Sequence, residues 1–469
     1  MKNSILNCSI ISLLILCGFN EIKAQAVDNR VYQYGILPSN RKASDATTAY
    51  TTWKGLYAVT CTSPQYRITF SNAAQTVSEG IGYGMLISAY MGDRTLFDGL
   101  WAYYQAHSPG GTNGNGVMDW QISGCGGTAS AGAATDADLD AALALVVADK
   151  KWTGYTTPAK NLIAKIKSSE IQSNVLKPGP GYGGTAETNI SYYAPGYYRV
   201  FANATYGGDA GWTTIASQAY TTINGSLTTN SAKGGLVSDW CTSTGAYSSA
   251  ASGYVLAGKT YSYDACRTPW RVAVDYAWFG TAAAKTYLDK TVAWVKTIPT
   301  LTKGVVDGYN QDGTPNANGQ FHNAPFVGGF ACAGVASDDA YLSAAYTDIT
   351  TITERAYFNY TLQTLYTIFL TGNFYNPLVG PTLAVATGVK ETESPALTAF
   401  VFENENTVFV SSPSSSKMDV VVMDMAGRVV HTASRSTNEN IRLDNLTPGV
   451  YVVRVNADGK MSNIRFIKQ

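Results

Sequence analysis

Two different patterns of hydrophobic and polar positions divide the chain. From residue 25 to about 376, apolar side chains recur at helical spacing, as at Leu362, Leu365, Ile368 and Phe369. This pattern predicts helices over 78–106, 134–152, 156–171, 194–206, 212–224, 268–296, 336–349 and 353–371. The loops between them are long and rich in Gly, Asn and Ser, and such loops on a helical scaffold usually carry function. We therefore expect a mainly α-helical domain whose helices are paired.

The pattern changes near residue 377. Pro and Gly residues interrupt the stretch 377–397, and from 398 the chain switches to short runs in which apolar and polar side chains alternate. These runs predict strands joined by hairpin-like turns, with strands over 407–412, 418–427, 440–446 and 449–460 and turns at 425–428 and 457–459. The sequence thus predicts a helical domain over 25–376, a linker over 377–397 and a small β-sandwich over 398–469.

The first 24 residues have the pattern of an export signal. Lys2 supplies the charged start, and the apolar run that follows is too short to span a bilayer. Ala24 offers the small residue that cleavage requires, so we expect residues 1–24 to be removed and the mature protein to be secreted or held at the cell surface. Lipid attachment at Cys17 is the alternative, which the large Leu16 before it disfavours. No other segment is long and apolar enough to predict a membrane span.

Composition narrows the class of ligand. Lys+Arg and Asp+Glu both number 33, so the balance of charge predicts no surface for nucleic acid or anionic membrane. Charged residues make up only 14%, whereas Gly (45) and Tyr (31) are numerous. This balance suits a neutral, hydroxyl-rich ligand, and it equally suits a protein with plain Gly-rich surface loops.

Histidine and cysteine usage argues against a metal site. The chain has three scattered His residues and neither a CxxC nor an HExxH motif, which disfavours a His-based metal site and a Ser-His-Asp triad. We expect no metal and no cofactor. Five cysteines follow the signal, so they cannot all pair within the chain, and a bridge between Cys241 and Cys266 remains open.

The most unusual acidic segment is ATDADLDAALALVVADKKW at 134–152. It places Asp136, Asp138 and Asp140 within five residues and then runs into an apolar helical pattern. One acid in a first helical turn is explained by the helix dipole or a cap, but three exceed that explanation. A buried carboxylate needs hydrogen bonds or a partner charge, and no Lys or Arg follows until Lys150. The segment therefore predicts the wall of a polar cavity.

Glu79 and Asp264 are the other candidate acids. Glu79 lies in TVSEGIGYGM, where Thr76-x-x-Glu79 fits a capping box, whereas glycines at alternate positions after the acid would clear space for a ligand. Asp264 lies in YSYDACRTPWR, where it either forms a structural ion pair with Arg267 or is a carboxylate kept ionised beside aromatic walls. The residues themselves leave both readings open.

Several aromatic residues stand beside these acids or in Gly-rich loops. Trp120, Tyr193, Trp240 and Trp270 are candidates for rings that stack on the apolar faces of sugars. Two carboxylates, aromatic walls and no cofactor motif form the minimal set for glycoside hydrolysis, in which one acid protonates the leaving oxygen and the other activates water or attacks the sugar.

These residues carry a family resemblance. The segment at 134–152 resembles the signature of glycoside hydrolase family 8, with one departure, because Ala141 stands where the pattern has Ile or Met. Further blocks resemble the family in family order: VSEGIGYGMLISAYMGD (77–93), VMDWQI (117–122), SYYAPGYYRVFA (191–202), GLVSDWC (235–241) and YDACRTPWRVAVDYAW (263–278). The likeness covers about 30 to 376.

The resemblance implies an (α/α)6 barrel with an acidic cleft and an inverting mechanism. If the four aromatic candidates line subsites in a long cleft, the action is endo. The resemblance also implies that Glu79 is the general acid, that Asp264 is the general base and that Asp136 contacts the sugar at the cleavage point. Substrate-binding roles are expected for Asp136, Trp120, Tyr193, Trp240, Arg267 and Trp270, and Asp138 and Asp140 are expected to be capping or solvated acids. The pKa of Glu79 must be raised against the pull of a helix N-terminus.

The presence of Asp264 and of Trp270 after Pro269 resembles the cellulase branch, so β-1,4-glucan is the preferred substrate. Xylanase, chitosanase and lichenase activities are the alternatives within the family. From other classes, a non-catalytic glycan-binding surface protein is disfavoured because both acids are present. A polysaccharide lyase is disfavoured because the sequence shows no basic or metal-binding cluster for a uronate.

The tail from about 398 resembles a type IX secretion sorting domain of Bacteroidetes. DMAGRVV, LTPGVYVVRV and the basic end IRFIKQ carry that likeness. The resemblance implies type IX secretion machinery as a partner. A carbohydrate-binding or immunoglobulin-like module is the alternative, which the few aromatic residues of the tail disfavour.

Overall fold

The structure is a computed structural model of the chain and divides into two units, Met1–Thr382 and Leu383–Gln469. It describes residues 30–109, 116–247, 260–317, 319–383, 398–402, 407–411, 417–424, 427–435, 439–457 and 460–468. The predicted signal peptide and most of the predicted linker lie outside these residues. No helix in the described ranges is long and apolar enough to cross a membrane.

Six helices of the first unit form a closed inner ring. They are apolar on nearly all sides and almost wholly buried: α2 (Ser78–Met91), α4 (Thr135–Trp152), α6 (Pro195–Phe201), α8 (Thr268–Phe279), α10 (Ala324–Ala333) and α12 (Tyr357–Leu370). Each packs against the next in chain order, and α12 returns to pack against α2. A helix that is apolar all round must be covered on all sides, so a second layer is required.

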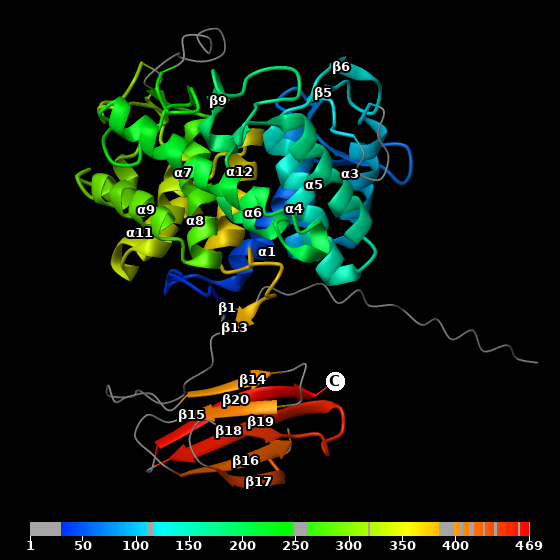
Figure 1. Cartoon of the computed structure of the whole chain (residues 1–469). Helices are drawn as coiled ribbons and strands as arrows, with labels where there is room; N and C mark the ends of the chain where they lie inside the picture. The colour runs from blue at the N-terminus through cyan, green and yellow to red at the C-terminus, as the bar shows by residue number, and fades with distance from the viewer. Residues whose placement is uncertain are drawn as a thin grey trace, which may run out of the picture. The chain divides into compact units, whose positions relative to one another are not determined.

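Six outer helices supply that layer. They are α1 (Ala43–Tyr57), α3 (Arg94–Ala106), α5 (Thr156–Glu170), α7 (Gly211–Thr229), α9 (Ala282–Val295) and α11 (Asp339–Thr351). Each buries a stripe, as α5 does with Ala159, Leu162, Ile163 and Ile166, and each packs mainly on one inner helix. The two layers, seen in Figure 1, form an (α/α)6 barrel, which confirms the expected fold class.

The helix predictions were right in place and wrong in some boundaries. The stretch 78–106 contains two helices, because Gly92 adopts a φ of 79° and Asp93 caps α3 through Leu96 N. The stretch 268–296 is divided in the same way by Gly280, with a φ of 62°. Helices α1 and α10 were not predicted: α1 is rich in Thr, and the apolar run of α10 contains two glycines, so neither has a strong periodic pattern.

Short strands cover the end of the barrel from which the inner helices start. The sheet of β4 (Thr76–Val77), β5 (Gln121–Ile122) and β6 (Thr128–Ser130) leads into α2. Two-stranded pairs follow: β9 (Thr188–Asn189) with β10 (Trp240–Cys241), and β11 (Thr260–Tyr261) with β12 (Tyr309–Asn310). Figure 1 shows β5, β6 and β9 at one end of this unit and β1 (Arg30–Val31) at the other.

Two further hairpin-like pairs and a disulfide complete the unit. The pairs are β2 (Ala58–Thr60) with β3 (Tyr66–Ile68), and β7 (Ile171–Gln172) with β8 (Val175–Leu176). The disulfide joins Cys61, in the β2–β3 loop, to Cys125, in the β5–β6 loop. Cys241 and Cys266 are buried free thiols, so the bridge left open between them does not form.

The second unit is built from two antiparallel sheets. One contains β14 (Thr398–Phe402), β15 (Thr407–Ser411) and β18 (Glu439–Arg442), and the other contains β17 (Val429–Arg435), β16 (Met418–Asp424), β19 (Gly449–Ala457) and β20 (Lys460–Lys468). Val420, Val422, Ile441, Val453 and Val455 share one buried core drawn from both sheets. The predicted small β unit is therefore present, although β14, β17 and β20 were not predicted as strands.

Candidate active site

The N-terminal ends of the inner helices bring the candidate acids together. Glu79 is the second residue of α2, Asp136 is the second residue of α4, and Tyr357 is the first residue of α12. Asp264 and Arg267 lie in the short turn directly before α8. Helix N-termini favour negative charge, so this end of the barrel is a suitable place for a group of carboxylates.

Arg267 connects three of these acids. Its Nη1 donates to Glu79 Oε2 at 2.8 Å and to Asp136 Oδ2 at 2.9 Å, and its Nη2 donates to Asp264 Oδ1 at 2.8 Å and to Ser191 Oγ at 2.9 Å. We call Glu79, Asp136, Asp264 and Arg267 the Arg267 cluster. One cation faces three carboxyl groups, so at least part of the negative charge is not balanced within the cluster.

Glu79 has the properties of a general acid. Its pKa is raised to about 7, chiefly by burial; Arg267 acts in the opposite direction, and the charges of Asp136 and Asp264 act in the same direction as burial. Tyr357 Oη donates to Glu79 Oε1 at 3.3 Å. The side chain is nevertheless 20% exposed, so a ligand can reach it. A carboxyl group that keeps its proton up to neutral pH can protonate a leaving oxygen.

The two local readings of Glu79 were both wrong. Thr76 Oγ1 donates to Ile68 O, and Val77, the residue directly before α2, provides no side-chain cap, so no capping box forms. The glycines do not clear space for a ligand either. A Cβ at Gly80 would lie 2.7 Å from Tyr357 Oη, and one at Gly82 would lie 2.7 Å from Ala137 O. They allow close packing of α2 against α12 and α4.

Asp264 is held from two sides and remains reachable. Trp240 Nε1 donates to its Oδ2 at 2.9 Å, Arg267 holds its Oδ1, and its side chain is 22% exposed. The ion pair between Asp264 and Arg267, proposed from the sequence, is therefore present. Glu79 and Asp264 are thus two reachable carboxyl groups bound to different nitrogens of one guanidinium.

Asp239 is a site residue that the sequence reasoning missed. Its Oδ1 accepts from Ser262 N at 3.0 Å and Ala265 N at 2.8 Å, so it fixes both sides of Asp264. Burial, followed by the charge of Asp264, raises the pKa of Asp239 to about 7. The available signal was its place directly before Trp240 in a family-like block.

The three acids at the start of α4 take three different roles. Asp136 joins the Arg267 cluster with a side chain only 3% exposed, and burial raises its pKa. Asp140 forms an ion pair with Arg271, whose Nη2 donates to Asp140 Oδ2 at 2.7 Å. Asp138 accepts a hydrogen bond from Tyr104. Asp138 and Asp140 are both fully buried, so the expectation that they are capping or solvated acids was wrong.

Only one of the four aromatic candidates is well exposed. Trp120 is 39% exposed, and its carbonyl accepts Ser78 N at 2.9 Å, next to Glu79. Tyr193 and Trp270 are fully buried: Tyr193 bonds to Thr188, and Trp270 packs in an aromatic core. The expectation that these two rings line the cleft was wrong, because their local spacing does not report burial.

Two other expected substrate contacts also change. Trp240 is 8% exposed and orients Asp264 through its indole N–H. Arg267 is 2% exposed and uses its guanidinium on the carboxylates and Ser191, so it arranges the acids rather than facing a substrate. The sequence reasoning did not single out Tyr263 as a ring facing the site. It is 37% exposed, and it directly precedes Asp264 and donates to Asp307 Oδ2 at 2.6 Å.

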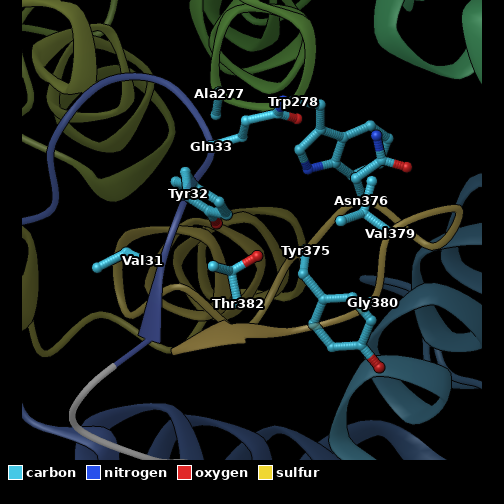
Figure 2. A pocket seen from close by; sticks show the side chains of 10 residues that line it. All are labelled: Val31, Tyr32, Gln33, Ala277, Trp278, Tyr375, Asn376, Val379, Gly380 and Thr382. Carbon is cyan, nitrogen blue, oxygen red and sulfur yellow. The ribbon is translucent and has the colours of Figure 1, made fainter. Parts of the chain in front are cut away.

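A small pocket elsewhere has different chemistry. Figure 2 shows it beside β1, lined among others by Tyr32, Trp278, Tyr375 and Asn376, with no Asp or Glu in its lining. The Arg267 cluster is therefore the candidate active site.

Two family models match the chain. Residues 30–372 match glycosyl hydrolases family 8, and residues 404–469 match a secretion system C-terminal sorting domain. The second match indicates export to the cell surface or beyond.

The most similar proteins agree with the first match. The chain is 37% identical to endoglucanase 2 of Ruminiclostridium josui over 74% of this chain and 76% of that protein. It is 35% identical to endoglucanase A of Acetivibrio thermocellus over 76% of each. The solved apo structure of a β-1,3-1,4-glucanase from Paenibacillus sp. X4 superposes with a TM-score of 0.67 and 27% identity, covering 74% of this chain and 99% of that one.

Proposed function

The chain belongs to glycosyl hydrolases family 8, and we propose that it is an endo-acting enzyme that cleaves β-1,4 links of a glucan of the cellulose type with inversion at the anomeric carbon. The observation that carries this proposal is that Arg267 holds two reachable carboxyl groups, Glu79 and Asp264, on different nitrogens. Burial raises the pKa of Glu79 to about 7, as a general acid that works near neutral pH requires.

In the proposed reaction Glu79 gives its proton to the glycosidic oxygen while the bond between that oxygen and the anomeric carbon breaks. Asp264 takes a proton from a water molecule, whose oxygen forms the new bond to the anomeric carbon from the opposite face. Asp136 contacts the distorted sugar at the cleavage point. The proton that leaves Glu79 is replaced from solvent, and the proton on Asp264 returns to solvent.

Arg267 and Asp239 prepare this arrangement without touching the substrate. Arg267 bonds to both Asp264 and Glu79, while burial raises the pKa of Glu79 to about 7. Asp239 fixes the backbone on both sides of Asp264. Trp120, next to Glu79, and Tyr263, next to Asp264, provide exposed rings on the acid and base sides, and such rings suit sugar faces.

The preference for β-1,4-glucan rests on the relatives named endoglucanases. The sequence argument from Trp270 no longer supports it, because that ring is buried. Lichenase activity is the second candidate, favoured by the likeness to a β-1,3-1,4-glucanase structure. Initial rates on carboxymethylcellulose, lichenan, xylan and chitosan decide between them; fastest cleavage of lichenan, xylan or chitosan overturns the cellulose preference.

Substitution tests the roles of the acids. Glu79→Gln and Asp264→Asn each remove one proton-transfer group and are expected to lower kcat on soluble β-glucan by about 10²- to 10⁴-fold. Thermal unfolding of both variants checks that the fold is retained. Glu354→Gln, at an exposed glutamate of the same unit, is the control and keeps wild-type turnover. Near-normal turnover of either active-site variant contradicts the assignment.

The stereochemistry is tested separately. Proton NMR of the first-formed product is expected to show the α-anomer from a β-glucan, because water enters opposite the leaving group. An initial β-anomer refutes inversion even if both acids prove essential.

For export, we propose that residues 1–24 are a cleaved signal peptide and that 398–469, after a linker over 377–397, address the hydrolase domain 25–376 to type IX secretion machinery. The matched sorting domain supports this proposal. In a bacterium that has this machinery, deletion of 398–469 is expected to retain the enzyme inside the cell envelope. Unchanged release of the deleted form overturns the proposed role of the tail.

A further inference from the structure

A second pair of carboxyl groups lies outside the Arg267 cluster. Asp138, in the first turn of α4, and Glu170, the last residue of α5, are both fully buried. Their carboxyl groups lie within hydrogen-bonding reach of each other. In the described part of the chain neither takes part in an ion pair, so no basic side chain balances them.

Four buried oxygens at this pair have no hydrogen-bond partner among the described residues. They are Asp138 Oδ2, Glu170 Oε1, Glu170 Oε2 and Thr135 Oγ1. Two adjacent carboxylates away from water repel each other and cannot bond, because both only accept. A proton on one carboxyl group removes the repulsion and supplies the missing donor, whereas the Thr135 hydroxyl can donate to Glu170 in either protonation state.

The surroundings decide which acid holds the proton. Asp138 Oδ1 already accepts from the Tyr104 hydroxyl on α3 and from Met118 N at 3.4 Å. These two donors stabilise the ionised form of Asp138. Burial raises the pKa of Asp138 to about 7 despite these donors. Burial, and then the charge of Asp138, raises the pKa of Glu170 well above its ordinary value. Asp136, the remaining charged neighbour, acts in the same direction on both acids.

The pair is tied to the turn that carries Asp136. Thr135 directly precedes Asp136, and its N–H donates to Pro178 O at 3.0 Å. Lys177 N donates to Glu170 O at 2.8 Å, so the residues that follow the β7–β8 hairpin connect the end of α5 to the start of α4. A displacement of Glu170 is therefore expected to displace Asp136. One connection runs through the side chain of Asp138, and the other through the backbone bonds to Lys177 and Thr135.

We propose that Glu170 is a neutral carboxylic acid that donates a hydrogen bond to Asp138, and that this bond is a positioning element that holds the first turn of α4 so that Asp136 faces the substrate. Its effect on catalysis rests on the proposed function, whereas the proton on Glu170 does not. The proposal adds to the site a residue that contacts neither the substrate nor the Arg267 cluster.

Infrared spectroscopy tests the proton directly. The carbonyl stretch of a carboxylic acid is separate from the carboxylate bands, and a Glu79→Gln background removes the acid of the active site. Adding Glu170→Gln to that background is expected to remove one carboxylic acid band at neutral pH. Adding Glu354→Gln, at an exposed glutamate, is the matched control and removes none. An unchanged acid band in the Glu170→Gln protein overturns the proposal, whatever the enzyme hydrolyses.

Kinetics tests the positioning role. Glu170→Gln keeps a donor for Asp138 and is expected to retain kcat within about threefold, whereas Glu170→Leu removes the donor and lowers kcat by about 10- to 100-fold, as misplacement of a substrate contact does. The loss falls on kcat more than on KM, because the contact of Asp136 acts on the distorted sugar.

Equal losses in the two variants, or an unchanged kcat in Glu170→Leu, contradict the positioning role. If Glu170→Leu does not fold, Glu170→Gln alone decides: it keeps the donor, so a loss of kcat greater than about tenfold contradicts the positioning role. If the wild-type enzyme hydrolyses no glycan, the proposed function fails while the infrared result still decides the state of Glu170.

Discussion

Arg267 and Arg271 lie one helical turn apart at the start of α8, and they hold acids in opposite ways. Arg271 and Asp140 form a one-to-one pair with both side chains fully buried. Arg267 faces three carboxyl groups, and two of them, Glu79 and Asp264, are about a fifth exposed. The first arrangement balances its charge and is closed to ligands. The second is unbalanced and open.

The difference shows what distinguishes a structural ion pair, Arg271–Asp140, from the group of charges at the candidate active site. Burial alone is common to both regions. In the Arg267 cluster burial raises the pKa of Glu79 to about 7, and the charges of Asp136 and Asp264 act in the same direction against that of Arg267. The two clusters are therefore expected to respond differently when one acid is neutralised.

The largest expected difference between the two regions is the loss of stability when one acid is replaced. Asp140→Asn leaves the Arg271 guanidinium buried without a counter-charge and is expected to lower the free energy of unfolding by about 3–5 kcal/mol. Asp264→Asn leaves Arg267 with two carboxyl partners and is expected to change it by less than about 1 kcal/mol. Urea unfolding of the two variants measures both values. Similar losses would remove the distinction between the clusters.

The pH dependence of activity gives the next effect. Glu79 must be protonated, so kcat/KM of the wild type is expected to fall as pH rises through about 7. Asp136→Asn removes a negative charge that raises the pKa of Glu79, so the alkaline limb is expected to move down by about one to two pH units. Initial rates measured from about pH 4 to about pH 9 give the shift. This range includes both the ordinary pKa of a carboxyl group and the raised pKa of Glu79. A limb that moves upward contradicts the charge-crowding argument.

The smallest effect is on the pH dependence of stability. The pKa of Asp239 is raised in the folded state, so its contribution is fully present below the ordinary Asp value and is lost as pH rises through about 7. Between these values the protein loses stability with a slope of about 1 kcal/mol per pH unit for each proton retained. Asp239→Asn is expected to make this slope shallower, by the amount that corresponds to about one bound proton. An unchanged slope shows that Asp239 is already ionised.

Much of the fold was predictable because the helices of the barrel are long and periodic. The exceptions have local physical reasons. Gly92 and Gly280 end helices inside continuous apolar patterns, because a positive φ is available to them and a periodic pattern does not record it. Helix α10 has no polar side to mark its period, because it is buried on every side.

The site was predictable in its acids and less so in its surroundings. Glu79, Asp136 and Asp264 meet on Arg267, as the resemblance implied for the three acids. Tyr193 and Trp270 were expected at the surface of a cleft and lie in the core, while Asp239 and Tyr263 were not proposed. An aromatic or acidic residue at a given spacing has the same local pattern whether its neighbours bury it or leave it open.

By itself the sequence determined the alternation of helices, the separate β unit, and the acids in family-like blocks, because these are properties of neighbouring residues. Only the tertiary structure decided which acids share a cation, which stay reachable and which have a raised pKa. The contacts of Arg267 with Asp136 and Glu79 join positions 131 and 188 residues apart. Burial and charge balance at such contacts depend on the whole ring of helices, and no local pattern records them.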